Sequence, residues 1–446
     1  KSIDAAYSAA RSSNGLEGGY EIVLRPGDYP QSIFLDQINA EASQQFPVVV
    51  RAEVPGTAVL HGFLTASGSH VYLIGLTFAG TPAGGGAVAV GNFDYVLLRD
   101  IHADGAINVT TGTHAYLENV TVNTGWGGVF VSYVQYGHII DSRVSSDLNP
   151  CVEVAGGSAY FLVDSNDVGP CKNGGAIQIG SVTSLDRHTS PWIHYDAYDV
   201  KVTNNLLQDP GVFTFFADGV YNVLFAHNTI VSSTNTVFVA AALGDRTCDN
   251  TSICQTFHDA GGWGPAAVEA PVASVPNRNV TVAANIFDEP NATPQAVIVR
   301  AEPPDTSGST SATNVPSPAK SDDNLSIRGN IIWAPSAQLL AGGAGACDSS
   351  NPTCNASQLA SDNQFNVINP QLQSNERPVA NGDLFGLAAL TIAPFTWSDA
   401  PTKPAVPQGE LVNSVTTDAD DVARTGYVPG AFTKSVAPGR DRAVKH

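Results

Sequence analysis

Two carboxylic acids near the middle of the chain have residue types and a spacing suited to paired acid–base chemistry. Glu153 lies between two valines in Cys151-Val-Glu-Val154, and Asp218 closes the segment Phe215-Phe-Ala-Asp218. In a half-buried β-strand alternate side chains face the core, so Glu153 is expected to point to solvent while its valine neighbours point inward. One carboxylic acid that donates a proton and one carboxylate that activates water are the groups used by inverting glycoside hydrolases. Glu153 and Asp218 are therefore the first catalytic candidates.

The segment that carries both acids repeats along the chain. From Cys151 to Ile230 a small residue, alternating apolar positions, a polar turn, a second apolar pair, an Asn and a third apolar pair recur. Short alternating pieces between Gly, Asn and Asp are typical of strands, and self-similarity at roughly 20 to 50 residues indicates a solenoid. The predicted first strands of successive coils begin at Ala87, Ala106, Gly128, Cys151, Ala176, Gly211, Thr236 and Ala296.

A second series of apolar positions supports the same stacking. An Asn stands three positions after each late member of the series, at Asn205, Asn228, Asn285 and Asn330. Asn side chains at a fixed turn position can hydrogen-bond to their copies in the neighbouring coils. The centres of the predicted second strands are Leu73, Leu98, Leu117, Ile140, Leu162, Val202, Phe225, Val282 and Ile327.

This repeat resembles the right-handed parallel β-helix of the pectate-lyase-like superfamily over roughly residues 21–370. The pieces Tyr20-Glu-Ile-Val-Leu24, Arg25-Pro-Gly-Asp-Tyr29 and Pro47-Val-Val-Val-Arg-Ala-Glu53 are similar to the opening coils of secreted β-helix polysaccharide lyases, including the chondroitinase B and alginate lyase group. The resemblance implies an all-β chain, a single-stranded right-handed parallel β-helix with three strands per coil. It indicates fold more than activity, because this fold carries lyases, hydrolases, epimerases, tailspikes and non-catalytic surface proteins.

A solenoid can use the whole chain as one unit, so one domain is predicted for residues 1–446. Residues 1–19 are expected to cap the first coil with a short amphipathic helix from Ser2 to Ser13 that ends at Asn14-Gly15. Residues 20–380 are expected to form the stacked coils, with loop insertions at 181–198, 243–277 and 301–323, and residues 381–446 a loop-rich C-terminal cap. The pieces Asp420-Asp-Val-Ala-Arg424 and Val428-Pro-Gly-Ala-Phe432 resemble the tail of secreted β-helix proteins, which folds back over the last coils.

The charge balance narrows the possible partners. A net charge of −20, from 21 basic and 41 acidic residues, argues against binding a phosphate backbone, so no nucleic-acid partner is expected. Hydrophobic residues make up 43% of the chain and charged residues 14%, which fits a filled core beneath an uncharged polar surface. No apolar run approaches the length of a bilayer span, so no membrane span is expected.

The six cysteines fall into three local pairs, Cys151–Cys171, Cys248–Cys254 and Cys347–Cys354. The even count favours disulfides and an oxidising compartment, with zinc binding as the alternative. A start at Lys1 is simply explained by a cleaved leader, so a secreted, extracellular glycoprotein is expected. The glycosylation candidates are the sequons at Asn108, Asn119, Asn250, Asn279, Asn291, Asn324 and Asn355.

The third position of each predicted first strand points outward, and these positions stack about 4.8 Å apart. Glu153 and Asp218 then lie two coils apart, with backbones about 10 Å apart. In sugar-active relatives the polymer lies in a groove along this strand, where aromatic faces can stack on sugar rings. The predicted column contains Ala89, Asn108, Phe130, Glu153, Gln178, Phe213, Phe238 and Ile298. The predicted substrate-binding residues are Phe130, Tyr133, Gln178, Phe213, Phe216 and His194.

The resembled lyases imply a competing chemistry, β-elimination, in which a base removes the proton beside a uronate carboxyl group that a cation neutralises. Lys172 and Arg187 are the catalytic candidates for it, grouped with Lys201 and Arg143 near the central coils. The Arg-x-Pro-x-x-Arg stretch of pectate lyases and the Asp-Pro-His-Asp of alginate epimerases are absent from the sequence. Calcium enters only by analogy with β-helix lyases, so no cofactor and no metal site is predicted. The reserve candidates on the first insertion are Asp186 and Asp196 as carboxylates, and His188 and His194 as metal ligands beside them.

Two functions from different classes are compatible with these features. The first is a secreted carbohydrate-active protein that binds, and as a lyase or glycoside hydrolase cleaves, an extracellular polysaccharide along the first-strand groove. The alternative is a non-catalytic structural glycoprotein of a matrix, wall or filament that assembles with copies of itself or other chains through its apolar strand face. Asn108 discriminates between them, because a glycan on it would block the groove.

Overall fold

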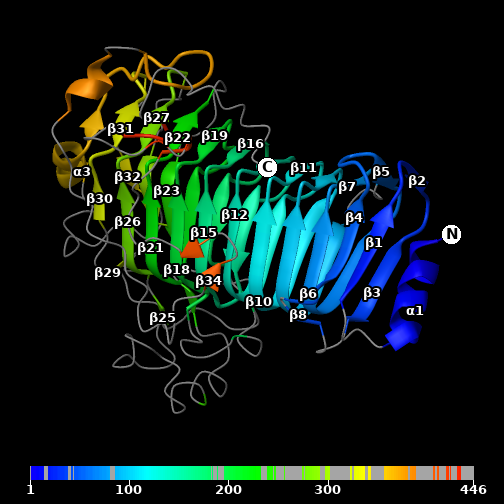
Figure 1. Ribbon diagram of the computed structural model, residues 1–446. Coiled ribbons are helices and arrows are strands. Elements are labelled where there is room, and N and C mark those ends of the chain that lie inside the picture. Colours follow the sequence, from blue (N-terminus) through cyan, green and yellow to red (C-terminus); the bar gives the residue numbers. More distant parts are fainter. Residues whose placement is uncertain are drawn as a thin grey trace.

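The computed structural model shows a chain wound into stacked coils, with the N-terminal helix at one end (Figure 1). Almost every strand pairs in parallel with the equivalent strand one coil later, which is the pairing of a parallel β-helix. The predicted right-handed parallel β-helix is therefore confirmed. The structure describes residues 2–14, 19–38, 42–43, 45–80, 86–181, 183, 188, 195–232, 239–244, 246–247, 256, 274–275, 277–291, 297–301, 322–323, 326–336, 340–342, 356–379, 382–387, 405–406, 409–410, 418–420, 422 and 429–432.

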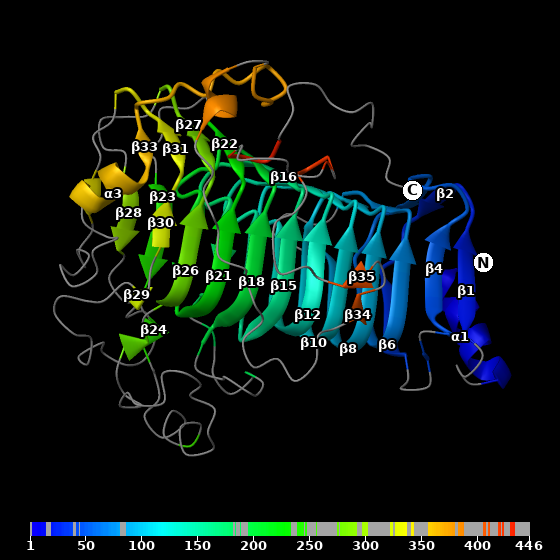
Figure 2. The ribbon, with the colours of Figure 1, turned by 60° about the vertical axis from the view of Figure 1, so that its left-hand side comes forward.

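Each coil contributes to three faces, which we name the first, second and third face in chain order. Four long strands run from the first face into the second: β6 (Leu64–Ile74), β8 (Gly86–Arg99), β10 (Ala106–Glu118) and β12 (Val129–Ile140). They join both faces into one 19-stranded sheet, while the third face is a 12-stranded sheet. Figure 2 shows the second face, where these strands and their later partners follow one another in chain order.

Beyond these four strands the faces are built from separate strands. The first face also contains β3 (Ile33–Ile38), β14 (Val152–Ala155), β17 (Ile177–Ile179), β20 (Phe215–Asp218), β23 (Val239–Gly244), β28 (Val297–Ala301) and β32 (Leu340–Gly342). The second also contains β1 (Tyr20–Leu24), β4 (Val48–Ala52), β15 (Ser158–Asp164), β18 (Ala197–Thr203), β21 (Val220–Ala226), β26 (Asn277–Ala283), β29 (Asp322–Asp323) and β30 (Ser326–Arg328). The third contains β2 (Gly27–Tyr29), β5 (Ala58–Leu60), β7 (Leu76–Phe78), β9 (His102–Ala103), β11 (Thr121–Thr124), β13 (Arg143–Ser146), β16 (Asp167–Cys171), β19 (Leu206–Gln208), β22 (Thr229–Val231), β27 (Ile286–Asp288), β31 (Ile331–Trp333) and β33 (Gln364–Phe365).

The core is the interior of the coil stack, and it follows from the period-2 pattern of the strands. Val129, Val152 and Ile177 stand one above another on the first face and are completely buried. The residues that follow them along the strands, Phe130, Glu153 and Gln178, are only partly buried and point away from the core. Alternating burial along the strands thus forms a continuous apolar column inside the described coils.

A ladder of buried Asn side chains closes the turn between the second and third faces. Asn228 Oδ1 accepts hydrogen bonds from the backbone N of Asn205 and from its side-chain Nδ2, both at 2.9 Å. Asn228 in turn donates from its backbone N and its Nδ2 to Asn285 Oδ1 at 2.8 and 3.0 Å. The same double contact continues from Asn285 to Asn330. The four predicted Asn positions are therefore confirmed as a stacked ladder.

The ladder is longer than the sequence predicted. Asn166 donates to Asn205 Oδ1, and Asn330 donates to Asn363 Oδ1, in the same way. Asn166 went unnoticed because the second-strand centres Ile140 and Leu162 are each wrong by one residue. The stacked residues are Ile139 and Val163, which neighbouring apolar residues mask in the sequence.

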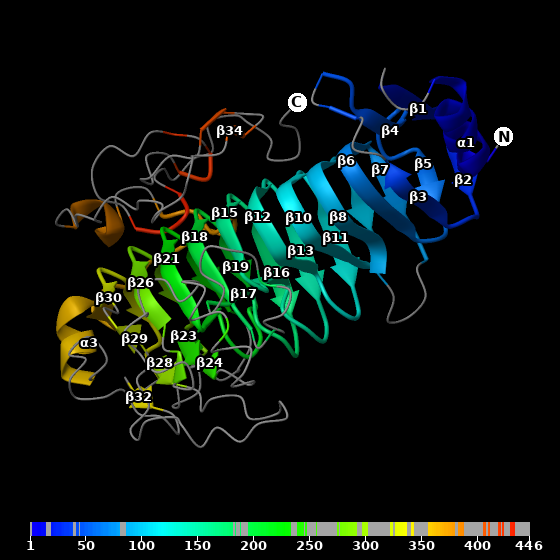
Figure 3. The same ribbon diagram turned by 90° about the horizontal axis from the view of Figure 1, so that it is seen from below.

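A short helix lies at each end of the coil stack (Figure 3). Helix α1 (Ile3–Asn14) begins after Ser2, whose Oγ accepts a hydrogen bond from Ala5 N at 3.2 Å, and it buries Ile3 and Tyr7. Figure 3 shows α1 and α3 (Ala356–Asp362) at opposite ends of the stack. The predicted N-terminal helix is confirmed.

The described part of the C-terminal segment contacts the coils. The Arg377 guanidinium and the Asp420 carboxylate form a buried ion pair, with Nη2–Oδ1 at 2.7 Å, and Arg377 also lies 4.1 Å from the ring centre of Phe432. Gly430 N donates to Ala284 O at 2.8 Å. The short elements here are η4 (Asp383–Gly386) and the antiparallel pair β34 (Ala405–Val406) and β35 (Gly409–Glu410). A second antiparallel pair, β24 (Arg246–Thr247) and β25 (Ser274–Val275), lies in the second insertion. No helix among the described residues is long and apolar enough to cross a membrane.

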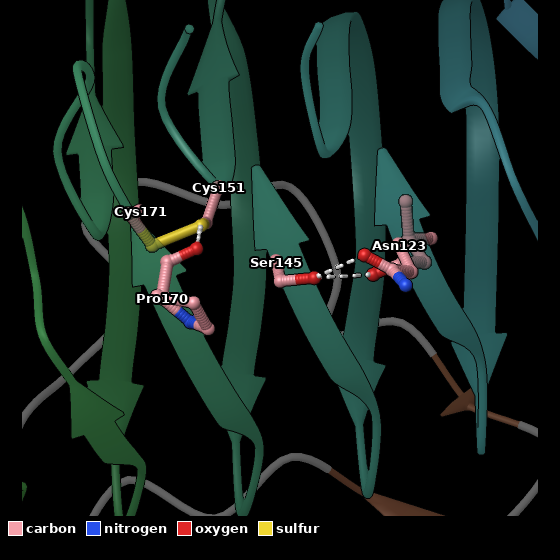
Figure 4. The surroundings of a disulfide bond; sticks show 6 residues. Asn123, Ser145, Cys151, Pro170 and Cys171 are labelled. Carbon is pink, nitrogen blue, oxygen red and sulfur yellow. Dashed lines mark hydrogen bonds between the residues drawn. A yellow bond between two sulfur atoms is a disulfide. The ribbon is translucent and has the colours of Figure 1, made fainter. Parts of the chain in front are cut away.

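One predicted disulfide lies within the described residues. Cys151 and Cys171 are bonded, with sulfur atoms 2.04 Å apart, and they join the end of β16 to the turn before β14 (Figure 4). The predicted pairs Cys248–Cys254 and Cys347–Cys354 lie outside the described residues.

We expect the double substitution of Cys151 and Cys171 by Ala to lower the free energy of unfolding by about 3 kcal/mol. The bond closes a loop with a sequence separation of 20 residues, which restricts the unfolded chain. Denaturant midpoints of the oxidised protein and the variant measure this effect. An unchanged midpoint would contradict it.

Candidate active site

The outward column on the first face is where the sequence placed a polymer groove. The structure aligns Asn108, Phe130, Glu153 and Gln178 on β10, β12, β14 and β17 in one register, as predicted. Beyond Gln178 the predicted register is wrong. Gln178 pairs with Phe216, which is followed by Ala242 and Arg300, in place of the predicted Phe213, Phe238 and Ile298.

The register error has a local cause. Gly211, taken as the start of a first strand, lies in a turn with φ +76°, and a Cβ there would approach the Cys171 carbonyl oxygen to 1.8 Å. Strand β20 begins only at Phe215, so the column continues with a phenyl ring three residues later than predicted. The predicted starts Thr236 and Ala296 also fall before β23 and β28.

Glu153 is the chemically distinctive member of the column. Its side chain is partly buried, with Phe130 one coil before it and Gln178 one coil after it. Burial raises the pKa of the Glu153 carboxyl to about 7, and the nearby Asp196 carboxylate adds to the increase. A carboxyl with a pKa near neutrality can both donate and accept a proton at pH 7.

Asp196 lies at the turn between the first and second faces, directly before β18, and binds Ser181 at the start of the first insertion. It is completely buried, and its Oδ2 accepts hydrogen bonds from Ser181 N at 2.6 Å and Gly156 N at 3.2 Å. Its Oδ1 contacts Thr183 Oγ1, and His188 Nε2 lies 3.4 Å away. These contacts give the reserve candidate Asp196 a structural role, because it links Ser181 and Thr183 to the turn at Gly156.

Asp218, the second predicted carboxylate, lies at the end of β20 and is 6% exposed. It stands two residues further along its strand than Phe216, the member of the Glu153 column. Its backbone is therefore offset from Glu153 by about 10 Å across the coils and about 7 Å along the strand. This separation is longer than the predicted one.

The predicted cations occupy different surroundings. Lys172 Nζ lies 2.8 Å from Asp147 Oδ1 in an exposed turn. Arg143 pairs with Asp167 at 3.2 Å on the third face. Lys201 is buried on the second face, where burial lowers the pKa of its ammonium to about 8. Arg187 lies outside the described residues, as do Asp186 and His194.

Aromatic rings border the column on both sides of Glu153. The rings of Phe213 and Phe216 are 5.3 Å apart between centroids. A Cβ at Gly127 would lie 2.5 Å from the Phe130 ring, so this glycine makes room for the ring. Tyr133 adopts φ +60°, and its ring centre is 5.9 Å from that of His188.

The second face carries a ring ladder that sequence reasoning missed. Tyr95 stacks on His70 at 4.6 Å and on His114 at 3.9 Å between ring centroids, and the stack continues through Tyr136 to Tyr160. The signal was present in five successive coils as a His or Tyr three residues before the stacked apolar residue of the second face. Because each ring face is covered by the next ring, the ladder supports the scaffold. Within the described ranges no three His, Cys, Asp or Glu side chains are grouped so that they could hold a metal ion.

Parallel coils with three faces, an Asn ladder in one turn and an outward column on the first face are the features of a right-handed parallel β-helix, the fold that the sequence resemblance implied. No family model and no curated protein matches the sequence. Among solved structures, the chain is similar to the A-module of a mannuronan C-5 epimerase of Azotobacter vinelandii, with 14% identity, coverage of 76% of this chain and 93% of that chain, and a TM-score of 0.43.

Two further solved structures illustrate the range of proteins with this likeness. A surface adhesin of Streptococcus pneumoniae has 13% identity, coverage of 78% of this chain and 77% of that chain, and a TM-score of 0.42. A PL6 family polysaccharide lyase from Pseudopedobacter saltans has 14% identity, coverage of 83% and 96%, and a TM-score of 0.31. At these identities the likeness concerns the fold alone.

Proposed function

We propose that this protein is an extracellular carbohydrate-active β-helix protein that binds a polysaccharide along the first face and cleaves it with Glu153 as the proton-transferring group. The observation that carries the proposal is a carboxyl group with a pKa of about 7 in the outward column, between aromatic rings. The disulfide between Cys151 and Cys171 supports an oxidising, extracellular setting.

Hydrolysis is the reaction that these groups support best. At neutral pH a large fraction of Glu153 is protonated, so it can donate a proton to the leaving oxygen of a glycosidic bond. Asp218 is the second carboxylate of this proposal and activates water. The described Lys172 is already paired with Asp147, which lowers its value as the base of a β-elimination. Lys172 and Arg187 remain the residues for that alternative.

A product assay tests the proposal. Purified protein is incubated with neutral and uronic polysaccharides, and both new reducing ends and unsaturated products are followed. We expect reducing ends without unsaturated products, because hydrolysis adds water while β-elimination leaves a double bond. If unsaturated products form, the reaction is β-elimination and not hydrolysis. The absence of either product from the whole panel would contradict the enzymatic proposal.

One observation favours the structural alternative. Trp126, Leu148 and Val212 on the turns before the first face are about half exposed. Exposed apolar side chains in one region often mark a contact with another chain. Mass spectrometry of Asn108 discriminates, because a glycan there would obstruct the column at its neighbour Phe130. A bare Asn108 with bound oligosaccharide favours the enzyme.

A further inference from the structure

The carboxylates around the column make its centre electrostatically negative. Glu153 lies in the column, Asp196 is buried near enough to act electrostatically on Glu153, and Asp218 follows the column member Phe216 by two residues on β20. The six members of the column from Ala89 to Phe216 are Ala, Asn, Phe, Glu, Gln and Phe, which include one acid and no base. Arg300, the base of the described column, follows two coils after Phe216 and four coils after Glu153. Lys172, in an adjacent turn, is paired with Asp147. A polymer with a carboxylate on every sugar would bring like charges against Glu153.

An apolar border runs along the same column. We name the exposed turn residues Trp126, Leu148 and Val212 the apolar rim; their exposed fractions are 48%, 50% and 49%. The turns of the rim stack in register. Asn149 Nδ2 donates to Trp126 O at 2.7 Å, and Val212 N donates to Gly174 O at 2.7 Å.

Two phenyl rings next to the apolar rim, those of Phe130 and Phe213, pack against glycines. A Cβ at Gly127 would collide with the Phe130 ring, and a Cβ at Gly175 would lie 1.9 Å from the Phe213 ring. Each ring therefore lies against bare backbone, next to the rim. Uncharged sugars present C–H faces that pack on such aromatic and aliphatic surfaces.

We infer that the glycan recognised on the first face is uncharged, a neutral polysaccharide whose sugar rings lie on the apolar rim and on Phe130 and Phe216. This inference rests on the proposed function and specifies its substrate class. Ionised Glu153 rejects a polyuronate, while the rim and the rings bind the faces of neutral sugars. Selection against charge thus comes from Glu153, and affinity comes from the rim.

Matched ligands test this substrate class. The probes are α- and β-linked hexasaccharides of glucose, mannose and galactose, together with the hexauronates obtained from each by oxidation at C6. Isothermal titration calorimetry at pH 8 measures their dissociation constants. We expect at least one neutral hexasaccharide to bind at least tenfold more tightly than its hexauronate. At pH 5, where Glu153 is mostly protonated, the ratio should fall at least threefold.

Variants connect the selectivity to the named residues. Trp126→Ala should weaken binding of the neutral hexasaccharide about tenfold, whereas Val367→Ala, at an exposed valine after β33, should leave it unchanged. Glu153→Gln should reduce the discrimination at pH 8. If the hexauronates bind as tightly as the neutral hexasaccharides or more tightly, and Trp126→Ala weakens their binding, the ligand is not neutral. The first face would still be the glycan-binding site. A panel in which no hexasaccharide of either kind binds would overturn the proposed function together with this inference.

Discussion

Glu153→Gln is expected to reduce polysaccharide cleavage by a factor of about 10² to 10⁴, which is the range for loss of a positioned general acid. The amide keeps the shape of the side chain and its place between Phe130 and Gln178, but its N–H protons are too weakly acidic to be transferred. Initial rates of reducing-end formation at pH 6 measure the loss. In the unmodified protein the rate should fall as the pH rises above about 7, since Glu153 loses its proton there.

The same substitution should stabilise the fold at alkaline pH. The pKa of Glu153 is raised from 4.5 to about 7, so the folded protein holds a proton that the unfolded chain has released between these values. Stability conferred by Glu153 therefore falls as the pH rises from 4.5 to 7 and stays low above it. Glu153→Gln removes this penalty, which amounts to at most about 3 kcal/mol above pH 7 and to nothing below pH 4.5.

Thermal unfolding at pH 4 and pH 8 measures this difference. The control is Glu53→Gln, at an exposed glutamate just after β4, which should change neither activity nor the unfolding temperature. Full activity in Glu153→Gln would remove Glu153 from the catalytic assignment. If the unfolding temperatures of the unmodified protein and of Glu153→Gln change with pH in the same way, Glu153 has an ordinary pKa in the folded protein.

Asn228→Ala should lower the free energy of unfolding by about 3 to 5 kcal/mol. It deprives the backbone N and the Nδ2 of Asn205 of their shared acceptor. It also removes the donor to Val202 O and to Asn285 Oδ1. All of these groups are buried, so no water replaces the lost partner.

The control for the ladder is Asn123→Ala. Asn123 is an exposed residue of β11 whose side chain accepts one hydrogen bond from Ser145 Oγ at 3.1 Å, and its loss should cost less than about 0.5 kcal/mol. Chemical unfolding followed by circular dichroism compares the two variants. Equal stabilities would mean that the ladder contributes nothing beyond an ordinary surface turn.

The sequence was sufficient for the repeating part of the fold. Asn205, Asn228, Asn285 and Asn330 could be found because each stands at a constant distance from a buried apolar residue, and the alternation around Glu153 correctly placed it outward. Local periodicity carries this information without knowledge of the tertiary structure.

The irregular parts could not be read in the same way. The shift from Phe213 to Phe216 depends on a glycine turn against the Cys171 carbonyl group, a contact between different coils. Asp196 looked like a catalytic reserve, because its hydrogen bonds to Gly156 and Ser181 join residues that are 40 and 15 positions away in the sequence. The pKa of Glu153 depends on the same packing. The chemistry of a site on a solenoid thus depends on contacts between coils that the repeat pattern of the sequence does not predict.

The Asn ladder has a consequence for how such a scaffold diversifies. Its successive contacts join residues that are 39, 23, 57, 45 and 33 positions apart, yet the hydrogen-bond lengths hardly change. The hydrogen bonds that close each coil therefore do not depend on the number of residues between two successive Asn residues of the ladder. A protein engineer could exchange the loop between two ladder Asn residues for another loop without changing the coils. Natural lineages could acquire new specificities in the same way.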